Sequence, residues 1–310
     1  MKTIRFLTAI IYSLAVLFGL TACSELGSVS YPNADKYSVG NASFSETIEK
    51  IDIDWPSGNV NIVTYSDNSF SLSEKIDNSA TDDMRVHWWL DGTTLRIKFT
   101  APGIKLRMLG NGQKELTVTV PKSIALSDIT VNSASANVKT DEIKADRVSV
   151  STSSGEMDIT CNARQIQLNS ASGSIKLGQI GKAEIIEMET ASGKIESILE
   201  RADKATFDSA SGTINICADE IINLSATAAS GRVSCMLNDG LKKCDLRAVS
   251  GNITLTLPEN AGFTAEIDST SGDFYSDFSL KKEGDTYICG DGSAEISVKT
   301  TSGDISVSKG

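Results

Sequence analysis

The residues best suited to chemistry in this sequence are three acids, Glu187, Glu189 and Asp208. Glu189 and Asp208 occupy the same position in neighbouring copies of a sequence repeat, and Glu187 lies two residues before Glu189. If the copies stack in register as β-strands, Glu189 and Asp208 lie about 5 Å apart. Carboxylates at that separation suit a retaining glycosidase, and such oxygen ligands also suit calcium. We expect a solvated acidic surface here, with a ligand or calcium site as the alternative.

Other residues that could support catalysis are few. His87 is the only histidine of the chain, so a Ser-His-Asp triad would depend on it. In the segment 86–90, alternation places Val86 on the inner side of a strand with Trp88 and Leu90, and places His87 and Trp89 outside. We therefore expect a solvated histidine, and a Trp89 that packs locally rather than stacking on a sugar. The sequence indicates no catalytic residue, no metal site and no cofactor.

Five cysteines follow Cys23 in the chain: Cys161, Cys217, Cys235, Cys244 and Cys289. Five is an odd number, so at least one thiol is free or pairs between molecules. Cys235 and Cys244 both fall at inward positions of one repeat, where cysteine acts as a small hydrophobic residue. A disulfide between these two remains an alternative. No CxxC or histidine-rich spacing indicates metal binding.

The elements that must position all these residues are copies of one repeat. Serine-glycine pairs recur with glycines 18, 20, 19, 19, 20, 21 and 31 residues apart, a period typical of solenoids. Apolar residues occupy odd offsets before each glycine and even offsets after it. The alternation between inward and outward side chains is therefore shifted by one residue at the glycine. A glycine does this at a corner with positive φ, and we expect inward serines to form a hydroxyl ladder there. The predicted corner glycines are Gly58, Gly155, Gly173, Gly193, Gly212, Gly231, Gly251, Gly272 and Gly303.

The alternation of period two around each glycine predicts half-buried β-strands. One copy cannot bury its apolar side alone, so the copies must stack and pair their strands in parallel. The predicted fold is all-β, a parallel β-solenoid of about 19–20 residues per coil. Residues 121–310 form the repeats, with a hairpin insertion near 277–293, and residues 45–120 form an N-terminal β section that caps the solenoid.

The first 44 residues predict export and anchoring. Residues 1–22 combine Lys2 and Arg5 with a short apolar run, as export signals do. Leu20-Thr21-Ala22-Cys23 resembles the lipobox of bacterial lipoproteins, in which the cysteine is lipidated and becomes the mature N-terminus. Residues 23–44 are polar, and we expect a tether there. An ordinary secretory signal is the alternative.

Composition limits the partners. Without the signal, the chain keeps all 40 acidic side chains but loses Lys2 and Arg5, so its net charge is about −13. A nucleic-acid-binding protein needs a basic surface, so we expect no nucleic-acid partner.

The repeats, the segment Leu116-Thr-Val118-Thr-Val120-Pro121 and the closing Thr301-Ser302-Gly303-Asp304-Ile305 resemble a β-strand-repeat family of bacterial envelope proteins labelled "putative adhesin". The resemblance covers residues 45–310 and implies a right-handed β-helix-like fold, with a role in surface adhesion or envelope-stress sensing. We therefore expect a non-enzymatic binding module, lipid-anchored to the bacterial cell membrane or outer surface, with an envelope protein or glycan as partner. The alternative is a carbohydrate-active enzyme, a lyase or hydrolase, on a β-helix.

Overall fold

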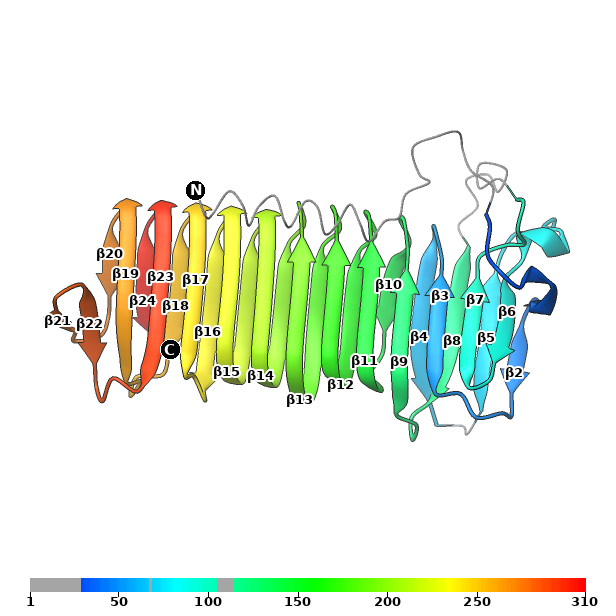
Figure 1. Ribbon diagram of the computed structural model, residues 1–310, viewed down its shortest axis with the longest axis horizontal. Coiled ribbons are helices and arrows are strands. Elements are labelled where there is room, and N and C mark those ends of the chain that lie inside the picture. Colours follow the sequence, from blue (N-terminus) through cyan, green and yellow to red (C-terminus); the bar gives the residue numbers. More distant parts are fainter. Residues whose placement is uncertain (1–28, 67–68, 105–113) are drawn as a thin grey trace.

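The computed structural model describes residues 29–66, 69–104 and 114–310, which form a long stack of β-strands in two layers (Figure 1). The described residues are all-β apart from two three-residue 3-10 helices. The alternation of apolar residues therefore predicted the fold class correctly. We call the layer toward the viewer in Figure 1 the front face and the fainter layer the back face.

The N-terminal section occupies one end of the stack. It contains η1 (Ala34–Lys36), β1 (Ser38–Val39), β2 (Ala42–Phe44), β3 (Lys50–Asp54), β4 (Asn59–Tyr65), β5 (Phe70–Lys75), η2 (Asp82–Met84), β6 (His87–Asp91), β7 (Thr94–Lys98) and β8 (Glu115–Pro121).

The repeats follow as β9 (Leu126–Asn132), β10 (Asn137–Thr140), β11 (Ile143–Thr152), β12 (Met157–Ser170), β13 (Ile175–Thr190), β14 (Ile195–Ser211), β15 (Ile214–Ser230), β16 (Val233–Asp239), β17 (Lys243–Ser250) and β18 (Ile253–Leu257). The chain ends with β19 (Phe263–Ser271), β20 (Phe274–Ser276), β21 (Lys281–Glu283), β22 (Thr286–Cys289), β23 (Ala294–Ser302) and β24 (Ile305–Lys309).

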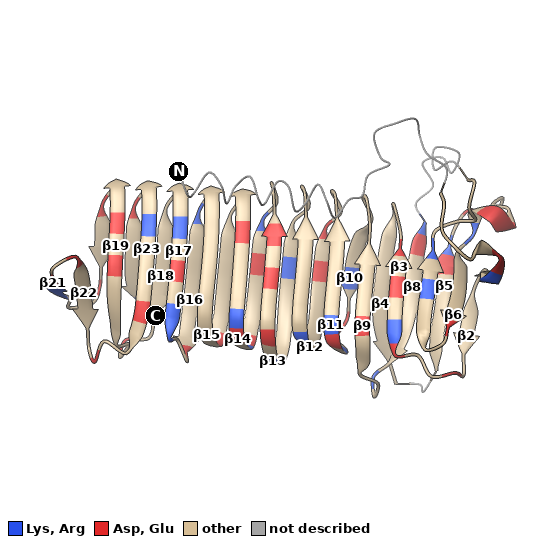
Figure 2. Cartoon of the chain, viewed as in Figure 1, with Lys and Arg blue, Asp and Glu red and all other residues tan. Residues whose placement is uncertain are grey.

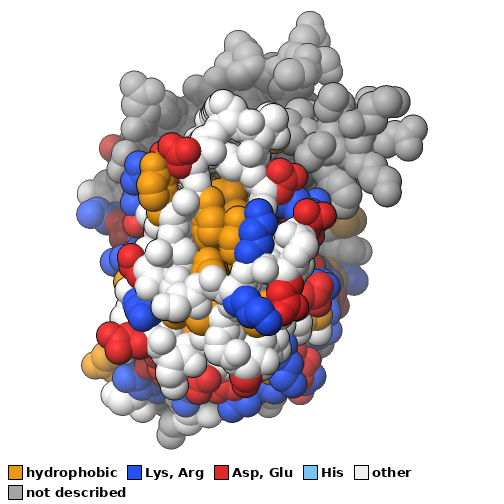
Figure 3. All heavy atoms as spheres, turned by 90° about the vertical axis from the view of Figure 1, so that its left-hand side faces the viewer, with side chains coloured by type: hydrophobic (Ala, Val, Ile, Leu, Met, Phe, Trp, Pro, Cys, Tyr) orange, Lys and Arg blue, Asp and Glu red, His pale blue; other side chains and the backbone are white. Residues whose placement is uncertain are grey.

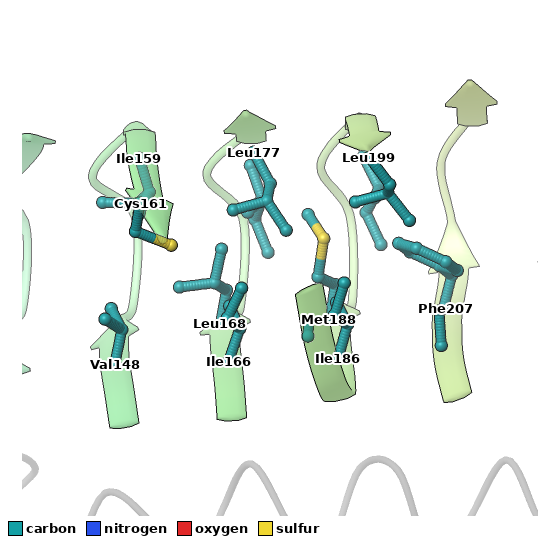
Figure 4. Packing of buried hydrophobic residues seen from close by; sticks show 14 of the residues in the cluster. Val148, Ile159, Cys161, Ile166, Leu168, Leu177, Ile186, Met188, Leu199 and Phe207 are labelled. Carbon is teal, nitrogen blue, oxygen red and sulfur yellow. The ribbon is translucent and has the colours of Figure 1, made fainter. Parts of the chain in front are cut away.

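Parallel pairing aligns equivalent residues of successive repeats. Ile166 is the register partner of Ile186, and Ile186 that of Ala205. These side chains are buried, and they stack in rows along the interior with Leu168, Met188 and Phe207 (Figure 4). Because each row continues from coil to coil, the core is one continuous cluster from the N-terminal section to the last coil.

The corner glycines do not all have the conformation that we predicted. Gly58, Gly231, Gly251, Gly272 and Gly303 have positive φ, between 91° and 153°. The positive-φ glycines do not include Gly155, Gly173, Gly193 and Gly212, so the prediction of positive φ is wrong for these four.

Close approach of the backbone explains the glycine at those four corners. A Cβ added at Gly193 would lie 2.1 Å from the carbonyl oxygen of Gly173 in the preceding coil, and one added at Gly173 would lie 1.9 Å from that of Gly155. Coils stacked at strand spacing thus bring successive corners too close for any side chain.

The hydroxyl ladder lies two residues earlier than the serine-glycine pairs. The backbone N–H of Gly173 donates to Ser170 Oγ at 2.7 Å, and that of Gly193 donates to Thr190 Oγ1 at 2.9 Å. Ser170 and Thr190 are fully buried, whereas the serines directly before the glycines, such as Ser172 and Ser192, are exposed. The inward orientation that we predicted for both odd offsets before each glycine is therefore confirmed for Ser170 and Thr190 and wrong for Ser172 and Ser192. The buried hydroxyls satisfy corner N–H groups that the turn leaves without a strand partner.

The last coil in the sequence is not the last coil in space. β23 pairs with β17 on one side and β19 on the other, and β24 lies likewise between β18 and β20. Figure 1 shows this C-terminal coil inserted between two coils that precede it in the chain. The hairpin β21–β22 then pairs with the outer edge of β19 over Phe263–Glu266. At this end of the stack, apolar side chains are visible at the centre of the end surface (Figure 3).

Residues 29–44, which we expected within a polar tether, pack against the N-terminal section. β1 pairs with β6 and β2 pairs with β5, both antiparallel. Phe44 is buried in the core, and Tyr31 donates a hydrogen bond of 3.0 Å to the carbonyl of Thr100. The prediction of a tether is therefore wrong for this part, because Phe44 and the strand edges of β5 and β6 provide it with partners. Residues 1–28, including the predicted signal and Cys23, lie outside the described residues.

Candidate functional site

The predicted acidic residues meet on the front face. Glu189 of β13 and Asp208 of β14 are register partners, while Glu187 is paired with Thr206. Glu187 is exposed, and Glu189 and Asp208 are half-buried. Figure 2 shows the acidic bands that these strands present. The stacking predicted for Glu189 and Asp208 is present, with Glu187 beside it.

Electrostatics distinguish Asp208 within this acidic patch. Burial raises the pKa of Asp208, the negative charge of Glu187 raises it further, and a hydrogen bond with Thr227 opposes the rise. Both the burial and the neighbouring charge disfavour the ionised form of this carboxyl.

Metal binding has no geometric support at the patch. Among the described residues, no group of three or more His, Cys, Asp or Glu side chains is arranged to hold a metal ion. The calcium site therefore stays a prediction without a ligand set.

Ion pairs between coils lie at or beside the register shifts in the middle of the long strands. Arg164 lies 3.0 Å from Glu184 and 3.7 Å from Asp146, Lys182 lies 2.8 Å from Asp203, and Arg201 Nη2 lies 3.1 Å from Glu220. Exposed pairs of this kind contribute at most about 1 kcal/mol each.

A cavity of about 730 Å³ opens where the C-terminal coil is inserted. The connection from β18 to β19 must pass over that coil, and its residues 257–263 form one wall with 237–242 and 293–294. Leu241, Leu257 and Ala261 provide apolar lining, and Asp239, Lys242 and Asn260 are exposed at polar positions. The size lies within the range of small-molecule sites. Sequence reasoning missed this cavity, and its only signal was the 31-residue gap between Gly272 and Gly303.

A second feature missed from the sequence is a buried ion pair in the N-terminal section. Lys114 and Glu74 have side chains only 2% exposed, with Lys114 Nζ 2.7 Å from Glu74 Oε1. The ammonium also donates to the carbonyls of Met84, at 2.8 Å, and Phe99, and lies over the ring of Trp55. Burial lowers the pKa of Lys114 to about 8, although Glu74 opposes this shift.

His87 and its neighbours differ from the prediction of a solvated histidine. His87 is only 6% exposed, and its Nδ1 lies 3.0 Å from the carbonyl oxygen of Arg85. Our prediction failed because β1 covers this edge: Val39 is the register partner of His87. Trp89 packs locally, 5.8 Å from the ring of Tyr37 and with Lys36 over its own ring.

The five cysteines in the described residues are all free, and only Cys217 is exposed. The alternative of a disulfide between Cys235 and Cys244 is therefore not supported. Burial raises the pKa of the Cys161 thiol to about 12 and also raises the pKa values of Cys235 and Cys244. These three thiols belong to the apolar core.

No helix among the described residues is long and apolar enough to span a membrane.

Comparisons with solved structures support the fold. A protein described as a "putative adhesin" from Parabacteroides distasonis superimposes with a TM-score of 0.54 at 14% identity, covering 88% of this chain and 97% of that one. A "putative lipid binding protein" from the same species gives a TM-score of 0.52 at 17% identity, covering 87% and 96%. At these identities the likeness concerns the fold. No curated protein matches the chain.

A family model spans nearly the whole folded region. The model described as Toastrack DUF4097 matches residues 48–308, from the strand before Gly58 to the final strand β24. The match includes the N-terminal section from β3 onward and all the serine-glycine repeats. By its sequence and by the stack of strands that it forms, this chain belongs to the Toastrack DUF4097 family.

Proposed function

We propose that this protein is a lipid-anchored module of the bacterial cell surface, which binds an envelope protein or a glycan without chemical turnover. The observation that carries the proposal is the packing of residues 29–44 into one end of the stack. Val29 accepts a backbone hydrogen bond of 2.8 Å from Gly103 and donates one of 3.0 Å to Ile104. The chain is thus fixed to that end only six residues after Cys23.

A short connection limits the position of the folded part. Six residues span at most about 20 Å when fully extended. A diacylglyceryl group on Cys23 would therefore hold the N-terminal section close to the membrane, and two acyl chains give stable anchoring. The front face and the cavity beside the C-terminal coil would remain available to a partner. The adhesin and lipid-binding descriptions of the two solved structures agree with a binding role.

Three finer features complete the proposal. We infer a right-handed stack of about 19–20 residues per coil, since parallel crossovers are right-handed in nearly all proteins. We also infer that the N-terminal section acts as a cap, because its outermost strands β1 and β2 are only two and three residues long and antiparallel to their neighbours. Short edge strands of this kind oppose the addition of further chains.

Membrane fractionation of Cys23→Ser tests the anchoring. We expect the variant to leave the washed membrane fraction or to keep its signal, while the thermal unfolding of the folded part is unchanged. Thr21→Ser, which keeps the cysteine, is the matched control. A processed Cys23→Ser protein that stays with washed membranes like the parent would contradict the proposal.

The alternative function, a carbohydrate-active enzyme, rests on the raised pKa of Asp208 beside Glu187 and Glu189. It is tested by incubating the purified protein with envelope glycans and analysing the products. Cleavage that disappears in Glu189→Gln or Asp208→Asn would replace our proposal by the enzymatic one. We expect no such cleavage.

A further inference from the structure

An apolar stripe crosses the middle of the back face. Ile198 and Met236 are 65% and 51% exposed, the two most exposed aliphatic side chains among the exposed large hydrophobic residues. Between them lies Cys217, the one exposed cysteine of the described residues. Ile198 is the register partner of Cys217, and Cys217 that of Met236, so the three side chains stand on adjacent strands.

The stripe lies at the centre of the nine strands that the repeats contribute to the back face. Pairing gives them the spatial order β10, β12, β13, β14, β15, β16, β18, β24 and β20, with Cys217 on the fifth strand. Beyond β10 the sheet continues into the N-terminal section through β4, β8, β5 and β2. Figure 1 shows β10, β16, β18 and β24 in the fainter layer behind the front face. Beyond the stripe in its own column are small residues on both sides: Thr160 and Gly178, then Thr256 and Ser308.

The adjacent column divides into two unlike halves. In spatial order it contains Lys139, Asp158, Lys176, Glu196, Asn215, Ser234, Thr254, Ser306 and Tyr275. The four residues before Asn215 are charged, and the four after it are uncharged. Asn215 lies on β15, the strand that also carries Cys217.

We propose that this back face is the interface between two copies of the chain, packed face to face with their long axes antiparallel. The two-fold axis runs parallel to the strands and passes over β15. Cys217 then meets Cys217 of the second copy, and Ile198 meets the second copy's Met236 in both halves of the interface. Contacts of this reciprocal kind are what a two-fold axis requires.

Charge favours the antiparallel arrangement over a parallel one. The antiparallel axis places Glu196 opposite Ser234 and Lys176 opposite Thr254, so each charged half meets an uncharged half. In the parallel arrangement the two-fold axis would run along the length of the stack, over the column of Ile198, Cys217 and Met236. It would place Glu196, two residues before Ile198, opposite Glu200 of the second copy, two residues after it. Like charges brought together in this way oppose binding.

The area is sufficient for a specific dimer. Nine strands at about 4.8 Å spacing extend about 38 Å, and five residues of strand extend about 17 Å. Two such faces bury about 1,300 Å² in total, which is within the standard range for stable interfaces. Each charged half, with its longer Lys and Glu side chains, faces the small Ser and Thr side chains of the second copy's uncharged half, so the two sheets can approach to the usual distance of about 10 Å.

Charge variants and cross-linking of the full-length protein, extracted in detergent, test this interface. We expect a dimer by light scattering, and a short bismaleimide should link the two Cys217 thiols. Cys217→Ser should lose the cross-link and remain dimeric. Ile198→Lys should weaken the dimer at least 100-fold, because the two-fold axis places each new charge in an apolar contact twice. Ile185→Lys, at a 38% exposed site on the front face, should have no effect.

A compensating variant distinguishes the two orientations. Ile198→Lys combined with Met236→Glu should restore the dimer, because position 198 faces position 236 of the second copy only in the antiparallel arrangement. Thermal unfolding confirms that each variant is folded. A monomer at 100 µM without cross-linking would overturn the proposal. A dimer that Ile185→Lys disrupts, or one that the double variant fails to restore, would also overturn it.

Discussion

Replacement of Gly193 by alanine tests why these corners need glycine. The added Cβ would lie 2.1 Å from the carbonyl oxygen and 2.7 Å from the carbonyl carbon of Gly173. Ordinary contacts begin near 3.4 Å, so the two coils must separate by more than 1 Å at this corner. The hydrogen bonds Ala191 N–H to Ser170 O, at 3.2 Å, and Ser192 N–H to Ala171 O, at 3.0 Å, lie directly beside it.

The expected loss follows from those contacts. Two backbone hydrogen bonds contribute about 1 kcal/mol each, and overpacking adds about 1–3 kcal/mol. We therefore expect Gly193→Ala to lower the free energy of unfolding by about 3–5 kcal/mol. Backbone strain of alanine itself contributes little, since Gly193 lies outside the positive-φ set. Lys194→Val, at the exposed neighbouring position, should be nearly neutral.

Asparagine separates close approach from φ strain. Asparagine tolerates positive φ better than alanine does. At Gly284, where φ is +60° and no atom lies within 4 Å of an added Cβ, asparagine should therefore be milder than alanine. At Gly193, asparagine should be as damaging as alanine, because both carry a Cβ.

Urea unfolding with a check on the m-value measures these changes. For a folded region of this size, 3–5 kcal/mol corresponds to a fall in Tm of about 5–9 °C. A loss below 1 kcal/mol for Gly193→Ala, or an asparagine variant as stable as the parent, would refute the close-approach explanation.

Three further predictions concern titratable groups. The pKa of Lys114 is lowered from 10.5 to about 8 in the folded state. Between pH 8 and pH 10.5 the unfolded chain therefore binds more protons than the folded one, so the free energy of unfolding should rise with pH, by about 3 kcal/mol in total. The double variant Glu74→Gln with Lys114→Met should abolish that rise in pH-dependent melts; an unchanged rise would show that other groups cause it. Asp208→Asn should raise Tm at neutral pH, because folding disfavours the ionised carboxyl, whereas exposed Glu187→Gln should act less; a lower Tm for Asp208→Asn would contradict this. If calcium binds Glu187, Glu189 and Asp208, it should raise the parent's Tm but not that of Glu189→Asn with Asp208→Ala; no response in the parent would leave the patch as solvated surface.

Local sequence patterns were sufficient to predict most of the strands and which of their side chains point inward. Alternation of period two marks the inward side of a strand wherever it occurs, so Ile166, Ile186 and Ala205 were correctly placed in the core. The repeat length likewise predicted that Glu189 and Asp208 are stacked. Both signals lie within one repeat or between neighbouring repeats, and stacking in register preserves them.

Contacts between distant segments decided what the sequence did not. His87 is buried because β1 returns to pair with β6, and no pattern in residues 86–90 encodes that return. The cavity at 257–263 exists because β23 inserts between β17 and β19. The spatial order of these three strands therefore differs from their order in the sequence, in which β23 comes last.

The corner glycines and the apolar stripe also separate what the sequence determines from what the tertiary structure decides. The sequence by itself determined that a glycine stands at each corner and that Ile198, Cys217 and Met236 occupy equivalent positions in successive repeats. Only the tertiary structure decided that the neighbouring backbone comes too close for a side chain at every corner, including the four without positive φ. It also decided that the three side chains face outward on adjacent strands. The physical reason is that composition and period act within one coil, whereas close approach and exposure depend on which coil lies next to it.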